Sequence, residues 1–197
     1  MDDTEAASEG DVRIGDASVH WRREGSGPPI VFLHGFPLSG RTWDAMISHL
    51  RDRFTCHAPD LIGLGGSHSA SGEDHASPGQ ARAIQAVLST LGLGSYALVG
   101  NDTGGWIARE LALIDPRVSP LHGAEKLPPS CLVVGTGDPL LAQSNALAAA
   151  LEGAGVPHEH IVCEGMPHGF LQLEALPPAR EALGRAIAFL KKHVPSA

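Results

Sequence analysis

Apolar positions along the chain follow two different periods, and these predict strands that are each followed by a helix. Runs that are apolar throughout, such as Ile30–Leu33 and Cys131–Val134, are typical of strands buried on both faces of a sheet. Apolar residues at helical spacing follow such runs, for example at Ile84, Val87 and Leu88. Strands that alternate with helices predict an α/β fold, with a mostly parallel sheet flanked by helices.

The expected elements run from residue 12 to near the end of the chain. Strands are expected over residues 12–23, 29–33, 54–58, 96–99, 131–136 and 161–163, and helices are expected to begin near residues 39, 77, 103, 140 and 177. Ser39 is a candidate helix cap, and Ser77–Gln80 has the pattern of a capping box with proline at the first helical position. Residues 1–11 are acidic and aperiodic and are expected to be disordered, which leaves 12–197 as a single domain.

Candidate chemistry appears first in the glycine-rich turn after the strand at 96–99. Gly100–Gly104 has the order small–x–nucleophile–x–small of a nucleophile elbow, a sharp turn that displays its central side chain. The central residue is Asp102, whose carboxylate is ionised at neutral pH and suits attack on a saturated carbon with a leaving group. A histidine-activated water would then hydrolyse the Asp102 ester, with backbone N–H groups holding the oxyanion. The alternative is a plain helix start that Asp102 caps.

A second glycine-containing turn, His34–Pro37, follows the apolar strand at 29–33. A turn at the C-terminal end of a central strand leaves backbone N–H groups free to face a ligand, so we expect the Phe36 N–H to be one donor of an oxyanion hole. The Thr103 N–H, directly after the nucleophile, is expected to be the second. His34 is expected to be a structural histidine beneath this loop rather than a catalytic group. The glycine-rich stretch Leu61–Ser67 lacks a Walker lysine and the GxGxxG spacing, so a structural turn is favoured over phosphate binding.

Composition and charge limit the kinds of molecule that the protein is expected to bind and the compartment in which it is expected. The 197 residues carry a formal net charge of -8 and have a pI of about 5.7, which argues against nucleic acid or an anionic membrane as partner. The apolar runs are too short to span a bilayer and the N-terminus is acidic, so a soluble cytoplasmic protein is expected. The three cysteines are widely spaced, which suits buried thiols rather than a metal or redox motif.

The chain resembles the α/β-hydrolase family, and its two halves resemble different branches of it. In the first half, HGFPLSGRTW (34–43), APDLIGLGGS (58–67), VGNDTGG (99–105) and ALIDPRV (112–118) are similar to haloalkane dehalogenases and epoxide hydrolases. In the second half, CLVVGTGDPLL (131–141) and GMPHGF (165–170) are similar to esterases related to hormone-sensitive lipase. The resemblance implies an α/β-hydrolase fold and a hydrolase that needs no cofactor.

The chain order of α/β-hydrolase triads then selects two further catalytic candidates. Asp138 follows a strand that comes after the elbow, and His168 lies in the loop after the last strand. Asp102 would be the nucleophile, His168 the base that activates water, and Asp138 the group that orients His168. Asp138 could instead cap the helix that follows it. His158 and His160 flank a glutamate, but no third ligand at a recognisable spacing supports a metal site.

Three departures from the family pattern bear on the expected activity. Residues 116–129 are too few to hold both a further strand and a cap domain, so the cap is expected to be missing and the sheet shortened, with a deletion or junction near 116–130. Dehalogenases commonly place Trp directly after the nucleophile to hold the halide, whereas this chain has Thr103 there, and Trp106 is expected to pack. Esterases carry serine at the elbow, and Ser39 and Ser144 lack that context.

The expected function is therefore hydrolysis of small organic substrates through an Asp102 ester, of the carbon–halogen or epoxide type. A short-chain carboxylesterase is the first alternative, and a degenerate hydrolase-fold binding protein without turnover is the second. A shortened sheet can leave an edge or apolar face uncovered, so a homodimer is also expected.

Overall fold

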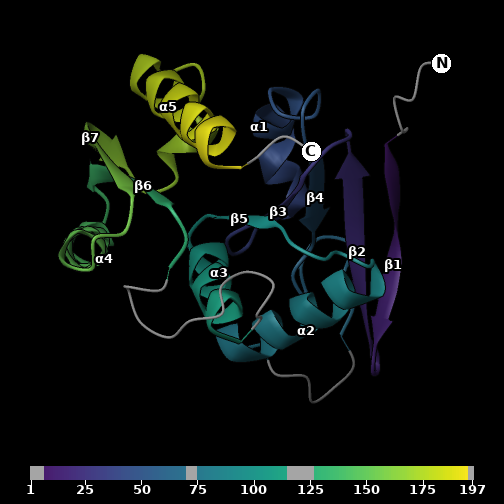
Figure 1. The fold of residues 1–197 in the computed structure, drawn as a ribbon. Helices are drawn as coiled ribbons and strands as arrows, with labels where there is room; N and C mark the ends of the chain where they lie inside the picture. Colours follow the sequence, from purple (N-terminus) through teal and green to yellow (C-terminus); the bar gives the residue numbers. More distant parts are fainter. Residues whose placement is uncertain (1–6, 70–74, 115–126, 195–197) are drawn as a thin grey trace. The chain divides into compact units, whose positions relative to one another are not determined.

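A mixed five-stranded sheet forms the base of the first half of the chain (Figure 1). The computed structural model describes residues 7–69, 75–114 and 127–194. The chain divides into two compact units, one of residues 1–118 with 196–197 and the other of residues 119–195. The single domain expected over 12–197 stays a prediction.

The strand order of the large sheet is β1-β2-β4-β3-β5. The strands are β1 Ser8–Ile14, β2 Ala17–Glu24, β3 Pro29–Leu33, β4 Thr55–Pro59 and β5 Ala97–Gly100. β1 pairs antiparallel with β2 and β2 with β4, whereas β3 is parallel to both β4 and β5. Because β3, β4 and β5 run in the same direction, the loops that begin at His34, Asp60 and Asn101 lie at the same edge of the sheet, where ligands bind in such folds.

The N-terminal edge of the sheet differs from the prediction. β1 begins at Ser8, so the expected disorder was wrong for residues 8–11, while residues 1–6 lie outside the described residues. The single strand expected over 12–23 is a hairpin, with a tight turn at Gly15, whose φ is 59°. The acidic residues of this edge strand can pair across it, since Oδ1 of Asp11 lies 3.1 Å from Nδ1 of His20. A charged edge strand is a common protection against unwanted strand pairing.

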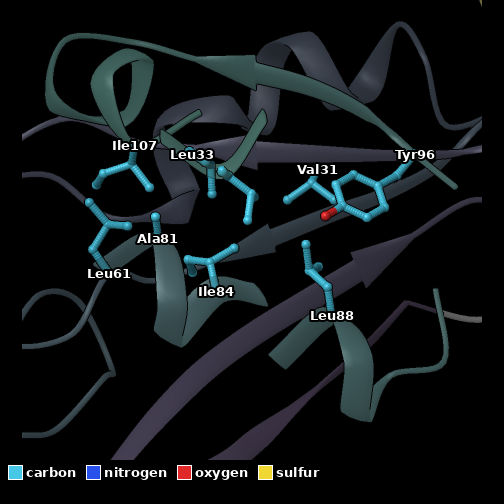
Figure 2. Close-up of a cluster of buried hydrophobic side chains, with 9 residues drawn as sticks. Val31, Leu33, Leu61, Ala81, Ile84, Leu88, Tyr96 and Ile107 are labelled. Carbon is cyan, nitrogen blue, oxygen red and sulfur yellow. The ribbon is translucent and has the colours of Figure 1, made fainter. Parts of the chain in front are cut away.

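Two helices cover one face of this sheet, and they bury an apolar core against β3 (Figure 2). These are α2 (Ser77–Thr90) and α3 (Thr103–Ile114). Side chains alternate along a strand, so Val31 and Leu33 both face this core. The cluster comprises Val31, Leu33, Leu61, Ala81, Ile84, Leu88, Tyr96, Ile107 and Leu111. The helix predicted from Ile84, Val87 and Leu88 is thus confirmed, with all three side chains fully buried.

The opposite face of β3 meets a short helical segment. This segment consists of the 3₁₀ helix η1 (Gly40–Trp43) and of α1 (Asp44–Ser48). Phe32 alternates with its neighbours in β3 and faces this side, where its ring centroid lies 5.6 Å from that of Trp43. Both faces of β3 are therefore buried, as its continuous apolar run predicted.

Two predicted side-chain caps of helices are not formed. Ser39 occupies the N-cap position of η1, but its side chain makes no capping bond, and the Gly40 N–H instead donates to Oδ1 of Asp60 at 2.6 Å. The capping box at Ser77–Gln80 is wrong: the Gln80 amide exchanges two hydrogen bonds with the Ile62 backbone, at 2.9 and 3.0 Å. In both cases a long-range partner replaces a local one.

The second unit is built on two parallel strands between two helices (Figure 1). The strands are β6 (Ser130–Gly137) and β7 (His158–Pro167), and the main helices are α4 (Leu141–Gly153) and α5 (Pro177–His193). Glu159 of β7 forms an ion pair with Arg185 of α5 at 2.7 Å, and the next residue, His160, bonds Ser144 of α4 at 3.1 Å. Because successive strand side chains point to opposite faces, α4 and α5 lie on opposite sides of the pair.

The connection between the units is short. α3 ends at Ile114 and β6 begins at Ser130, so the chain between them has no room for a cap domain, as predicted. The junction expected near 116–130 falls largely on residues 115–126, which lie outside the described residues.

His57 is a buried titratable group in the middle of the large sheet. Its side chain lies on β4 and the residue is 6% exposed, and within the described residues its Nδ1 has no hydrogen-bond partner. Burial, with a contribution from the Arg23 charge, lowers the pKa of His57 to about 4. The folded protein therefore holds His57 neutral across the physiological range of pH.

We predict that His57 makes the first unit sensitive to acid. A lowered pKa in the folded state means that the unfolded chain binds the proton first, so stability is full above pH 6.5 and is lost as the pH falls toward 4. Between pH 7 and 4.5 the free energy of unfolding should fall by roughly 2 kcal/mol through this group. His57→Leu should remove that part of the pH dependence, while His49→Leu, at an exposed histidine, should not.

Urea unfolding followed by tryptophan fluorescence measures this effect, because Trp21, Trp43 and Trp106 all lie in the first unit. Equal pH dependence in wild type and His57→Leu would contradict the prediction.

Candidate active site

The sharp turn between β5 and α3 displays Asp102. Asp102 has φ of 53° and is the single non-glycine residue with positive φ among the described residues. This left-handed conformation is unfavourable for a residue with a side chain, and such strain is concentrated at functional positions. The turn is closed by hydrogen bonds from Gly104 N–H to Asn101 O and from Gly105 N–H to Asp102 O, both 2.9 Å. The strand, turn and helix predicted around Gly100–Gly104 are confirmed.

The glycines of this turn are required by close backbone approaches. A Cβ atom on Gly104 would lie 2.0 Å from the carbonyl oxygen of Leu33 in β3, and one on Gly100 would lie 2.5 Å from the carbonyl oxygen of Gly104. Any side chain at either position would displace the backbone. Gly105 is different, since the nearest atom to its added Cβ is 3.8 Å away.

The loop after β3 touches the Asp102 carboxylate. The Phe36 N–H donates to Oδ2 of Asp102 at 3.3 Å, and a Cβ on Gly35 would lie 2.8 Å from Cβ of Asp102. Thr103 also contributes to this contact, through its hydroxyl, which donates to the same Oδ2 at 3.0 Å. The sequence predicted the Thr103 backbone N–H as a donor and missed the hydroxyl, for which the residue type was the available signal.

A buried hydrogen-bond network supports that loop from below. His34 is fully buried, its Nδ1–H donates to Gly35 O, and its Nε2 accepts from the Leu61 N–H, both at 2.9 Å. Both ring nitrogens form hydrogen bonds with backbone groups, as expected for a structural histidine. Burial lowers the pKa of His34. Asp60 joins the same loops, since its carboxylate accepts from the N–H groups of Gly40 and Gly66. Leu61–Ser67 is therefore a structural turn, as predicted.

The second unit places His168 beside Asp138. Nδ1 of His168 lies 3.0 Å from Oδ2 of Asp138, whose side chain is 9% exposed, while Oδ1 of Asp138 accepts the Leu140 N–H at 2.8 Å. Asp138 thus satisfies the start of the next helix and holds the histidine at once. A carboxylate on Nδ1 favours the tautomer with a proton there, which leaves Nε2 as the basic nitrogen.

An irregularity in β6 lies just before this pair. The pairing with β7 shifts between Gly135 and Gly137, and the Thr136 hydroxyl accepts the Gly165 N–H at 2.8 Å. A Cβ on Gly135 would lie 2.0 Å from the carbonyl oxygen of Met166. Such bulges re-aim the chain next to functional sites, and this one precedes both Asp138 and the loop that carries His168.

The predicted residues therefore form two groups. Asp102, Phe36 and Thr103 meet in the first unit, and His168 meets Asp138 in the second. Trp106 does not pack as expected, because its side chain is 46% exposed one turn after Asp102 in α3. Of the two serines considered, Ser144 bonds His160, and neither lies in an elbow.

Two further features concern the described part of the chain. It contains no group of three or more His, Cys, Asp or Glu side chains placed to hold a metal ion. None of its helices is long and apolar enough to cross a bilayer.

Family models match both halves of the chain. Two distinct models described as alpha/beta hydrolase fold match residues 28–122 and residues 105–172. The chain belongs to the α/β-hydrolase fold family. The shortened, mixed sheet with flanking helices is its form of that fold.

Relatives of this α/β hydrolase each match about half of its length. Haloalkane dehalogenase 2 from Mycobacterium bovis is 40% identical over 95 residues, which is 48% of this chain and 33% of that protein. A soluble epoxide hydrolase from Corynebacterium sp. is 38% identical over 91 residues, 46% of this chain and 31% of that protein. The chain thus spans about a third of the length of these relatives.

A solved structure covers nearly the whole α/β hydrolase. It is a hydrolase from Thermoplasma acidophilum described as CIB-like, with a TM-score of 0.74 and 20% identity over 95% of this chain and 99% of that chain. At this identity the likeness concerns the fold alone.

We predict opposite effects for two adjacent glycines of this α/β hydrolase. Gly104→Ala should destabilise the first unit by about 2 to 4 kcal/mol, because the new methyl group meets the backbone of β3. Gly105→Ala should be neutral or stabilising by up to about 1 kcal/mol, since alanine favours a helix and space is available. Urea unfolding monitored by tryptophan fluorescence measures both, and similar changes in the two variants would contradict the close approach of α3 to β3.

Proposed function

We propose that this protein hydrolyses small organic substrates through a covalent ester on Asp102, opening a carbon–halogen bond or an epoxide. The observation that supports this most directly is the Asp102 carboxylate, displayed on a strained turn and held by the Phe36 N–H and the Thr103 hydroxyl. A residue that served simply as a helix cap would need neither the left-handed backbone nor a donor from another loop.

The first step is displacement at carbon. An oxygen of Asp102 attacks the carbon that carries the leaving group, a carbon–oxygen bond forms, and the carbon–halogen bond breaks with its electron pair leaving as halide. With an epoxide the ring carbon–oxygen bond breaks instead, and the alkoxide takes a proton from water. A carboxylate can do this without a base, which suits an aspartate at the elbow.

The second step is hydrolysis of the ester. His168 removes a proton from water, the hydroxide adds to Cγ of Asp102, and the resulting oxyanion is held by donors. Collapse breaks the bond between Cγ and the ester oxygen, the alcohol leaves with a proton from His168, and Asp102 is restored. The hydrogen bond from His168 to Asp138 supports this role, because it orients the ring and stabilises the imidazolium.

The similarity of about half of the chain to a haloalkane dehalogenase and a soluble epoxide hydrolase supports this class of chemistry. The missing cap supports a broad substrate range. Without a cap domain the active site is open to water, so desolvation of the reacting groups accelerates the reaction less. We therefore expect modest rates and relaxed specificity.

The test starts with His168→Ala and intact-mass spectrometry. The variant is incubated with a bromoalkane, styrene oxide and an aryl acetate in turn. Without the base, the ester on Asp102 should accumulate, and steady-state turnover should fall by about 10³-fold or more. Asp102→Ala should form no adduct, and His49→Ala, at an exposed histidine far from these groups in sequence, should behave as wild type.

A single turnover of the wild type in ¹⁸O-labelled water gives an independent result. The ester route puts the label into Asp102 and not into the first molecule of product, because water attacks Cγ. Label in the product alone, with cleavage of the aryl acetate, would favour the esterase alternative with Asp102 as a base. No turnover and no adduct with any substrate would favour the degenerate binding protein.

A further inference from the structure

One oxygen of the Asp102 carboxylate, Oδ2, accepts two hydrogen bonds. The Phe36 N–H and the Thr103 hydroxyl both donate to Oδ2, at 3.3 and 3.0 Å. These donors come from two elements, the loop after β3 and the first residue of α3, and so they approach the oxygen independently. Both donors stabilise negative charge on Oδ2 and so lower the nucleophilicity of this oxygen.

Both donors are held in place by tight packing. The added Cβ positions on Gly35 and Gly104 would lie 2.8 Å from Cβ of Asp102 and 2.0 Å from the carbonyl oxygen of Leu33, so the loop, the elbow and β3 are in direct backbone contact. The Thr103 hydroxyl sits on the residue next to Asp102 at the start of α3, a regular helix that is buried against the core at Ile107. Donors fixed in this way need no rearrangement during reaction.

We infer that the Thr103 hydroxyl is a catalytic oxyanion donor that assigns separate roles to the two Asp102 oxygens, an inference that rests on the proposed function. Oδ1 attacks the substrate carbon and becomes the ester oxygen, while Oδ2 becomes the carbonyl oxygen of the ester. When hydroxide adds to Cγ, Oδ2 takes the negative charge, and Thr103 and the Phe36 N–H donate to it. Collapse returns that electron pair to Cγ and expels Oδ1 with the alcohol.

The charge on Oδ2 falls during ester formation and rises during ester hydrolysis, so a hydrogen bond to Oδ2 affects the rates of these two steps in opposite ways. Oδ2 carries about half a charge in the carboxylate, none in the ester and a full charge in the tetrahedral intermediate. A hydrogen bond to Oδ2 therefore opposes ester formation and promotes ester hydrolysis, since only the interaction that strengthens toward a transition state accelerates that step.

Removal of the hydroxyl should accordingly change the rates of ester formation and ester hydrolysis in opposite directions. In Thr103→Val, which has the same shape, ester formation should be unchanged or up to severalfold faster, and ester hydrolysis should be slowed by about 10- to 100-fold. The ester should then accumulate on Asp102 at steady state in a protein that retains His168. Thr103→Ser, which keeps a hydroxyl, should restore hydrolysis to within about threefold of wild type.

Quenched-flow intact-mass spectrometry measures the appearance and the loss of the ester separately, with whichever substrate of the three forms an adduct. Thr90→Val is the matched control, because its hydroxyl bonds Ala86 O within α2 and it should leave both steps unchanged. Tryptophan fluorescence confirms that each variant is folded. If Thr103→Val folds and both steps keep their wild-type rates, or both are slowed equally, the hydroxyl has no role as an oxyanion donor.

The outcomes separate this inference from the proposed function. Ester that forms in Thr103→Val and is hydrolysed as fast as in wild type rejects the inference alone. Absence of any ester in His168→Ala, with no label in Asp102 after a single turnover, rejects the proposed function and the inference together.

Discussion

The first unit depends on the close approach of the elbow helix to the end of β3. Gly104 lies so near the Leu33 carbonyl that no side chain fits between them, and Gly100 meets the backbone of Gly104 in the same way. This contact bends the chain sharply enough to force Asp102 into a left-handed conformation. It also brings the loop after β3 against the carboxylate, so one packing constraint shapes both the displayed aspartate and its donors.

Much of the fold could be predicted from the sequence because its central strands are buried on both faces. The run Pro29–Leu33 gave β3 correctly, and the helical spacing of Ile84 and Leu88 gave α2. The predictions that were wrong concern residues whose structure is determined by partners distant in the sequence. The acidic residues after Ser8 indicated disorder, but this segment forms a strand by pairing with β2. The Gln80 side chain bonds the Ile62 backbone rather than the start of its own helix. Local patterns contain no information about such partners.

In the candidate site, too, some features followed from the sequence and others depend on three-dimensional contacts. The glycines around Asp102 mark a turn that few other sequences could form, and this made the elbow predictable. The pairing of His168 with Asp138 followed from chain order, since both residues end neighbouring parallel strands. The residue type of Thr103 shows that a hydroxyl is present, but its bond to Asp102 depends on a rotamer and on the direction of Oδ2, which the sequence does not determine. Exposure of Trp106 was missed because helical spacing alone does not tell which face meets solvent.

The distribution of these groups along the chain has an evolutionary consequence. Asp102 and its Phe36 and Thr103 donors lie within residues 36–103, whereas the histidine and its aspartate lie within residues 138–168. Under the proposed mechanism, the first segment determines which bond is broken and the second determines whether the protein is regenerated. A different second segment could then be joined to the same first segment with no change in the bond attacked. The match of the two halves to different models of one fold is what such an exchange would leave behind.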